Sequence, residues 1–185
     1  MSDKPELKLR DLMQSGYETA RKIVLTGQEA VPVFIAQWGD GNVAIYATPW
    51  GSEEEKGRIL TILRVLFAAR NVQQYALISE VWAVERKSLE EIGERMPSEC
   101  EDRRERLMIL GVASDKILAA FADLGHGQDN SRTCGPLTWI NDADKFGGRM
   151  AELLPDPAWG LPPPGTAEML EAKFGIKPEA FTSVH

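Results

Sequence analysis

The sequence has few cysteines and no long apolar run. Cys100 and Cys134 are the only cysteines among 185 residues. A small secreted domain usually carries more, so two free thiols in a reducing compartment are expected. The longest nearly apolar stretch, residues 59–69, is about half the roughly 20 residues that a membrane-spanning helix needs. Residues 1–14 lack the apolar segment of a secretory signal, so we expect a cytoplasmic protein.

The residues that usually hold metals or phosphates are also scarce. The two histidines, His126 and His185, are too few for a histidine-based zinc site. Residues 141–144 begin like a calcium loop, but Phe146 stands where an oxygen ligand is needed. The glycines match neither the P-loop nor the dinucleotide fingerprint. No metal site and no cofactor are predicted.

Basic residues are outnumbered by acidic ones. The chain has 21 lysines and arginines against 28 aspartates and glutamates, a net charge of −7. Nucleic-acid binding depends on basic patches that displace counterions from phosphates. We therefore expect neither nucleic acid nor a membrane as a partner, and a small-molecule ligand has no support in the sequence.

The patterns in the first 70 residues predict a helix, a hairpin and a second helix. Residues 7–24 place apolar side chains at three- and four-residue steps, which predicts an amphipathic helix. Residues 31–38 and 43–48 are β-branched and aromatic, and the Asp-Gly pair between them predicts a hairpin with a two-residue type I′ turn. Ser52 and Glu55 form a capping box that begins the second helix.

A central strand is the firmest feature of the middle of the chain. Residues 74–84 are apolar on both faces, as in an interior strand, and a strand reached through a helix is often parallel to an earlier neighbour. The charged stretch 85–106 predicts an exposed excursion. Residues 106–113 and 116–122 predict a hairpin, with a helix over 117–124 as the alternative.

The C-terminal third has weaker patterns. Residues 137–140 resemble a short strand, and a helix is possible over 144–154. Six of the 11 prolines follow Leu154, which predicts an extended, polyproline-like arm over 155–185. The arm either packs on a neighbouring subunit or folds back on its own domain.

These elements predict an α+β fold. We expect a mixed, largely antiparallel sheet of about five strands with two main packed helices, in the order α-β-β-α-β-β-β. Residues 1–125 form the core domain, residues 126–154 pack on it, and residues 155–185 form the Pro-rich C-terminal arm.

A family resemblance agrees with this domain boundary. The segment from Ser79 to Trp82 has a Ser-Glu-x-Trp pattern, and Pro97-Ser98 and Asp102-Arg103 lie in the polar loop before a return strand. In these features residues 6–125 resemble a loose group of uncharacterised bacterial and phage proteins, which has no established activity.

The carboxylate of Glu80 is the leading candidate for a functional group. It lies in an otherwise apolar strand, so it must face solvent, a partner or a cleft. One interpretation is an acid, base or ligand acceptor with Trp82 as a wall and Arg86 or Arg103 as its charge partner. The other, which we favour, is a structural ion pair.

Two further groupings of residues could form a catalytic site. The charge run that contains Asp102, Arg103 and Glu105 could supply a second acid to Glu80, but such runs are usually solvated. A thiolate–imidazole pair of Cys134 and His126 would need rigid positioning, which this segment does not promise.

Two functional hypotheses follow from the sequence. The leading one is a non-catalytic interaction or accessory module, a homo-oligomer or a binder of another protein, because aromatic residues accompany an extended arm. The rival is a small hydrolase or ligand-binding enzyme that uses Glu80, Trp82 and Arg86.

Overall fold

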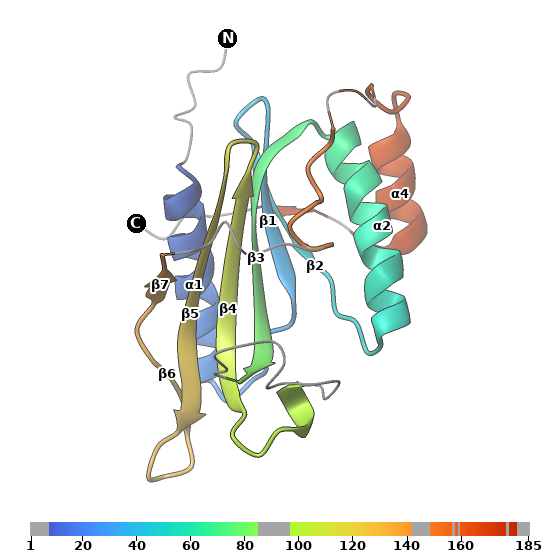
Figure 1. Ribbon diagram of the computed structural model, residues 1–185. Helices are drawn as coiled ribbons and strands as arrows, with labels where there is room; N and C mark the ends of the chain where they lie inside the picture. The colour runs from blue at the N-terminus through green and yellow to red at the C-terminus, as the bar shows by residue number, and fades with distance from the viewer. Residues whose placement is uncertain are drawn as a thin grey trace.

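The computed structural model is an antiparallel sheet with helices on both faces (Figure 1). It describes residues 8–84, 97–141, 149–156, 158, 160–176 and 178–180. The elements, in chain order, are α1 (Leu9–Leu25), β1 (Val33–Trp38), β2 (Val43–Ala47), α2 (Glu53–Ala69), β3 (Val72–Ala83), η1 (Pro97–Glu99), β4 (Arg104–Ala113), β5 (Lys116–His126), β6 (Arg132–Cys134), β7 (Thr138–Ile140), α4 (Thr166–Phe174) and β8 (Glu179–Ala180).

The sheet has the strand order β6-β5-β4-β3-β1-β2-β8, with β7 also paired to β5. The α+β class is confirmed, and so is the order of the main elements from α1 to β5. The largely antiparallel character of the predicted sheet is confirmed, but a mixed sheet and the number of about five strands were wrong, because eight strands take part and every pair in the described chain is antiparallel. The reason is that α2 returns the chain to the free side of β1, where β3 pairs antiparallel with β1.

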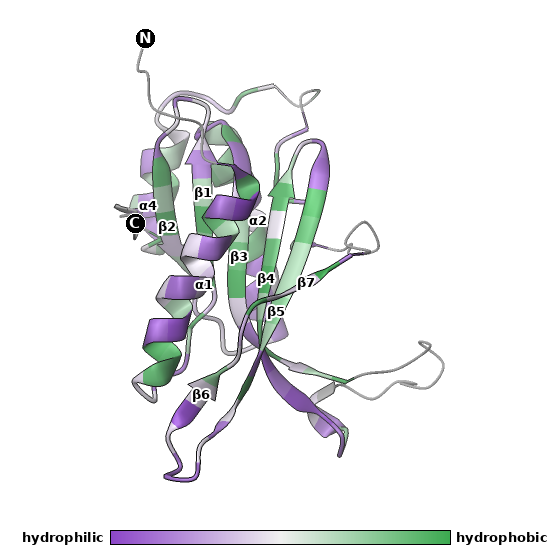
Figure 2. Cartoon of the chain, turned by 90° about the vertical axis from the view of Figure 1, so that its left-hand side faces the viewer, coloured by the Kyte–Doolittle hydropathy of each residue, from purple (hydrophilic) through white to green (hydrophobic). Residues whose placement is uncertain are grey.

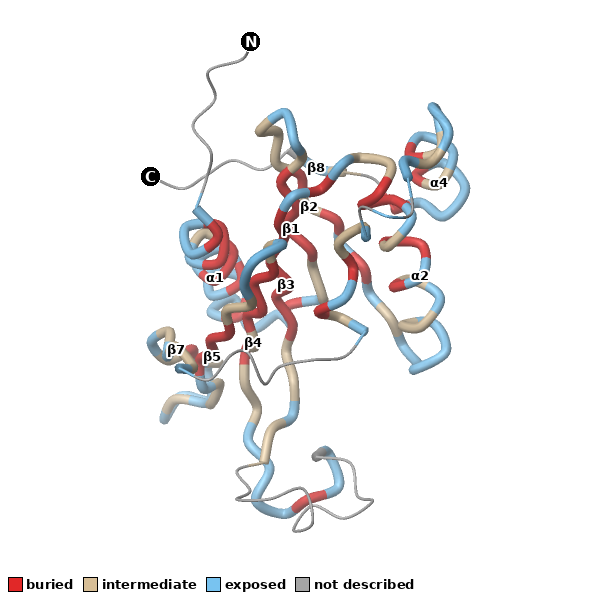
Figure 3. The backbone as a smooth tube through the Cα atoms, turned by 45° about the horizontal axis from the view of Figure 1, so that its top comes forward, coloured by how far each residue is buried: buried red, intermediate tan, exposed pale blue. Residues whose placement is uncertain are grey.

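The central strand β3 is buried on both faces, as predicted (Figure 3). Tyr75 and Leu77 point into the core beneath α2, whereas Ala76 and Ile78 point into the core beneath α1. This alternation follows from the two-residue period of a strand. Each face of the sheet therefore has its own apolar core.

Helix α1 lies close to the sheet because of a glycine. It packs on β3, β4 and β6. A Cβ atom at Gly16 would come within 2.7 Å of Ile78 Cδ1 and 2.9 Å of Ile35 Cδ1. Lys8 occupies the N-cap of α1 without a side-chain hydrogen bond.

The β1–β2 hairpin is confirmed, but its predicted turn was wrong. The amide of Trp38 donates to the Asn42 carbonyl at 2.8 Å, and Gly41 has a φ of +81°. A type I′ turn needs positive φ at both central residues, which Asp40 does not have. Instead, the Asp40 side chain accepts a hydrogen bond from the Asn42 amide at 2.9 Å, which stabilises a longer loop.

Helix α2 begins at the predicted capping box. The Glu55 amide donates to Ser52 Oγ at 3.1 Å, and the Gly51 amide donates to Glu55 Oε2 at 2.7 Å. The helix contributes Phe67 to an aromatic cluster with Phe34, Tyr46 and Tyr75 of the sheet, in which four pairs of rings have centroids 5.4 to 6.2 Å apart.

The C-terminal segment contains elements that the sequence analysis did not predict. Helix α4 packs against α2, and β8 pairs with β2. Arg70 at the end of α2 donates three hydrogen bonds to the buried Glu171 of α4, the shortest at 2.8 Å. No helix occurs over residues 149–154, and residues 142–148 lie outside the described part of the chain. The alternative helix over 117–124 is excluded, because these residues belong to β5.

Two matched glycine substitutions test this packing. Gly16→Ala should lower the free energy of unfolding by about 1–2 kcal/mol, because the clash with Ile78 and Ile35 outweighs the gain in helix propensity. Gly57→Ala in α2 is the control. Its Cβ would meet only the end of the Arg149 side chain, so it should stabilise by up to about 1 kcal/mol. Urea unfolding measures both, and equal stabilisation by the two substitutions would contradict the close approach of α1.

Candidate functional site

Glu80 lies near the end of β3, on the face of the sheet that α1 covers. It follows Ile78 at the two-residue step of a strand, and its side chain is only 7% exposed. Beyond the end of α1, the loop to β1 approaches it. The amide of Ala30 donates to Glu80 Oε1 at 2.7 Å.

Arg132 of β6 is the charge partner of Glu80. Its Nη1 donates to Glu80 Oε1 at 3.1 Å, and its Nη2 donates to Glu80 Oε2 at 2.9 Å. The same side chain reaches the carbonyl of Gln28 at 3.0 Å and Glu105 Oε1 at 2.7 Å. One nearly buried guanidinium therefore joins β6, β3, β4 and the loop between α1 and β1.

The protonation equilibria of this cluster reflect burial and pairing. Burial raises the pKa of the Glu105 carboxyl above its usual range, because it removes water from the charged form. A hydrogen bond with Glu80 adds to this rise. The nearby Arg132 opposes this effect. The bond to Glu80 in turn raises the pKa of Arg132, which keeps the guanidinium charged.

This geometry leaves Glu80 few ways to act on a substrate. Oε1 already accepts two hydrogen bonds, and Oε2 accepts a charged one. A general acid or base needs an oxygen that can reach the proton it transfers, and both oxygens of Glu80 are already engaged. The contacts are those of a structural ion pair.

Only some of the other predicted site residues lie close to Glu80. Glu105 joins Glu80 through Arg132, as described above. Trp82 lies opposite Glu105 in the strand pairing, is 46% exposed, and is covered by the Arg103 guanidinium at 4.9 Å from the ring centroid. Asp102 lies in an exposed turn before β4. Arg86, the proposed charge partner, lies outside the described residues.

Arg132 itself was missed by the sequence analysis. It lies 52 residues from Glu80 along the chain, in a segment with no apolar periodicity. The feature of the sequence that could have indicated its position is the turn before it. Asn130, with a φ of +63°, and the hydrogen bonds around Gly127 return the chain so that Arg132 pairs with His126.

An apolar groove lies beside this cluster, on the same face of the sheet. We call it the α1-side groove. It has a volume of about 390 Å³, one wall is α1, and its floor is formed by β1 and β2. The loop residues 28–31, which Glu80 and Arg132 hold, line one part of it. Its apolar lining includes Ala20, Ile23, Val31, Val33, Ile35 and Ile45.

The floor of this groove is less covered than the opposite face of the same strands. Phe34, Ala36, Ala44 and Tyr46, which face α2, are all buried. On the groove side, Ile35 and Gln37 of β1 are buried, whereas Val33, Val43 and Ile45 are half-buried and Ala47 is exposed. Figure 2 shows α1 in front of the sheet with β2 visible beside it. Helix α1 therefore leaves the β1–β2 part of this face open.

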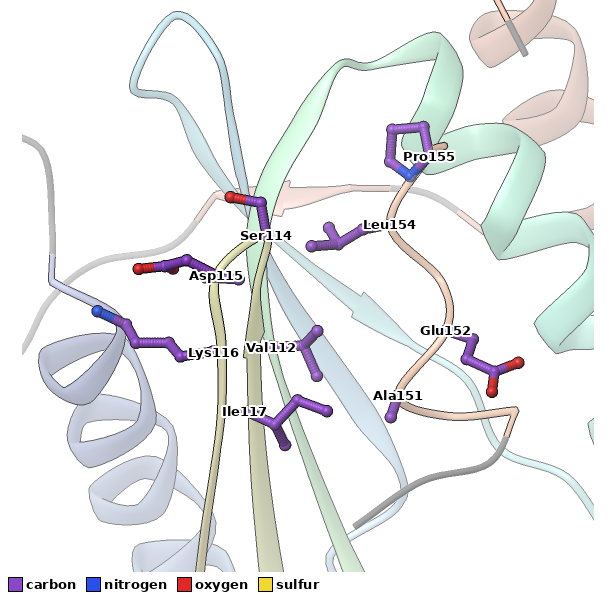
Figure 4. Close-up of a pocket in the computed structure, with 10 residues that line it drawn as sticks. Val112, Ser114, Asp115, Lys116, Ile117, Ala151, Glu152, Leu154 and Pro155 are labelled. Atoms are coloured by element: carbon purple, nitrogen blue, oxygen red, sulfur yellow. The ribbon is translucent and has the colours of Figure 1, made fainter. Parts of the chain in front are cut away.

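A second, more open groove lies at the other end of the sheet. It has a volume of about 780 Å³ and separates the β4–β5 turn from residues 151–155 (Figure 4). Its apolar residues include Val112, Ile117 and Leu154, and Asp115, Lys116 and Glu152 supply charges of both signs. This mixture gives no preference for one class of ligand.

The thiols do not form the arrangement of a catalytic dyad. Cys134 is buried, and burial raises the pKa of its thiol, the reverse of what an activated nucleophile needs. The described residues contain no group of three or more His, Cys, Asp or Glu side chains placed to hold a metal ion. Within the described ranges, no helix is long and apolar enough to cross a membrane.

Comparison with known proteins adds no assignment. No family model matches the chain, and neither a curated protein nor a solved structure shows significant similarity to it. The resemblance to uncharacterised bacterial and phage proteins therefore stays a prediction.

Removal of the Glu80 charge tests the structural role of the cluster. Glu80→Gln should lower the free energy of unfolding by about 1–3 kcal/mol, because Arg132 would lose its bidentate partner in a nearly buried site. Glu53→Gln is the control, since Glu53 is 63% exposed in its pair with Lys56 and should change stability by less than about 0.5 kcal/mol. Urea unfolding that gave equal effects for the two substitutions would argue against a structural ion pair at Glu80.

Proposed function

We propose that the protein is a non-catalytic interaction module that binds a polypeptide segment in the α1-side groove. The observation that carries this proposal is the uneven cover of β1 and β2. Their α2-facing side chains are buried, whereas on the groove-facing side Ile35 and Gln37 are buried but Val33, Val43 and Ile45 are half-buried and Ala47 is exposed. A set of uncovered apolar side chains in a row is typical of a protein-binding surface.

Exposed residues at the rim support the same function. Ile23 is 39% exposed and Val31 is 45% exposed, and both line the groove. Leu25, in the last turn of α1, is exposed as well. Large apolar side chains therefore continue from the groove onto the surface around the end of α1.

The Glu80 cluster supports this function indirectly. Glu80 and Arg132 bind backbone atoms of Ala30 and Gln28, two residues that line the groove. The ion pair therefore fixes the loop at its end. A role in positioning the loop accounts for the carboxylate in the central strand without any catalytic step.

The partner segment belongs either to a second copy of the chain or to another protein. Both possibilities follow from the sequence analysis, and self-association is the simpler to measure. Light scattering over a range of concentrations would show a mass that rises with concentration if a second copy fills the groove.

Two matched valines test whether the groove is an open apolar binding surface. Nile red, a neutral apolar dye, should bind the full chain, and Val31→Glu should weaken its binding by about tenfold because a charge enters the groove. Val65→Glu is the control. Val65 lies on α2 and is 41% exposed, close to the value for Val31.

Circular dichroism should show that both variants keep the wild-type fold. Dye binding that is absent, or that Val31→Glu and Val65→Glu weaken equally, would overturn the proposed function.

A further inference from the structure

We propose that the segment bound by the α1-side groove is a basic amphipathic helix of a partner protein. This inference rests on the proposed function and specifies its partner. It comes from three features of the described residues: the unequal number of helices on the two faces, the depth of the groove, and the sign of its charges.

The first feature is a difference between the two faces of the sheet. One face carries two neighbouring helices, α2 and α4, whereas α1 is the one described helix on the other (Figure 1). Because α1 packs on β3 and β4, a helix over β1 and β2 would lie about two strands away. Strands are about 4.8 Å apart, so the two helix axes would be roughly 10 Å apart, the usual spacing of packed helices.

The second feature is the depth of the groove. Its volume of about 390 Å³ is enough for a few side chains but not for a whole helix. A helix that lies along the groove inserts only the apolar residues of one face, at steps of three and four. Val33 and Ile45 on the floor and Ile23 on the wall would contact these residues.

The third feature is the charge around the groove. Among its described lining residues, Glu29 and Glu179 are charged and the others are not. Glu179 pairs with Ile45, so it shares the face of the floor and lies at the rim away from α1. Both glutamates are exposed. Lysine or arginine side chains flanking the apolar stripe of a helix would therefore meet acidic partners.

The overall charge acts in the same direction. The chain carries −7, which favours the approach of a basic segment and disfavours that of an acidic one. Because the two glutamates are exposed, salt should weaken the attraction.

Three labelled peptides test the inference by fluorescence anisotropy on the full chain. The first is an amphipathic helix with leucines at i, i+3, i+4 and i+7 and lysines on its flanks. The second has glutamates in place of the lysines, and the third has the composition of the first in scrambled order. The first should bind at least about fivefold more tightly than either of the others.

Charge reversal at the rim provides the matched variants. Glu29→Lys combined with Glu179→Lys should reverse the preference, so that the glutamate peptide binds more tightly than the lysine peptide. Glu54→Lys combined with Glu101→Lys changes the net charge equally at two exposed residues that do not line the groove, and should leave the order unchanged.

The outcomes separate this inference from the proposed function. Equal binding of the ordered and scrambled peptides, or the same preference in both double variants, would overturn the basic helix. If none of the peptides binds while Nile red still depends on Val31, the basic helix is wrong and the groove remains a binding surface. If Nile red does not depend on Val31, the proposed function itself fails.

Discussion

The contact on which the described structure most depends is the ion pair of Arg132 and Glu80. The two charges are nearly buried, and one guanidinium binds two carboxylates and a backbone carbonyl. A buried charge without a partner is costly, so each of these groups requires the others. The pair thereby fixes three strands and one loop relative to each other at the end of the sheet where α1 stops.

The groove is a consequence of how α1 is held. Gly16 lets the helix approach Ile35 and Ile78 closely, and the tyrosine hydroxyl of Tyr17 donates to the Gly135 carbonyl at 2.7 Å. With α1 placed over β3, β4 and β6, Ile35 of β1 is buried, but the other apolar side chains of β1 and β2 on the same face stay partly exposed. The Glu80 cluster then holds the loop that borders this open part.

Local patterns were enough to predict most elements of the fold. The period of apolar residues predicted α1, the Ser52 cap predicted the start of α2, and the two-sided apolar pattern predicted the central position of β3. These signals arise within a few residues. The turn after β1 was wrong because the side chain of Asp40 stabilises a longer loop, which composition alone does not distinguish.

Long-range contacts could not be predicted in this way. The sequence indicated that Glu80 needs a partner, but the partner is brought in by the β5–β6 turn, far along the chain. Helix α4 follows a proline-rich segment and is held by the bonds between Arg70 and Glu171, which join residues 101 positions apart. The groove was also beyond prediction, because it depends on which strands α1 leaves uncovered.

The claim that the α1-side face of β1 and β2 binds a partner helix can be tested most directly by isoleucine methyl NMR. On addition of the lysine-flanked peptide, the methyl signals of Ile23, Ile35 and Ile45 should shift, because these residues line the groove. Those of Ile59 and Ile117, which pack against the core on the α2 side of the sheet, should not. Shifts confined to Ile59 and Ile117, or spread evenly over both sets, would contradict the account.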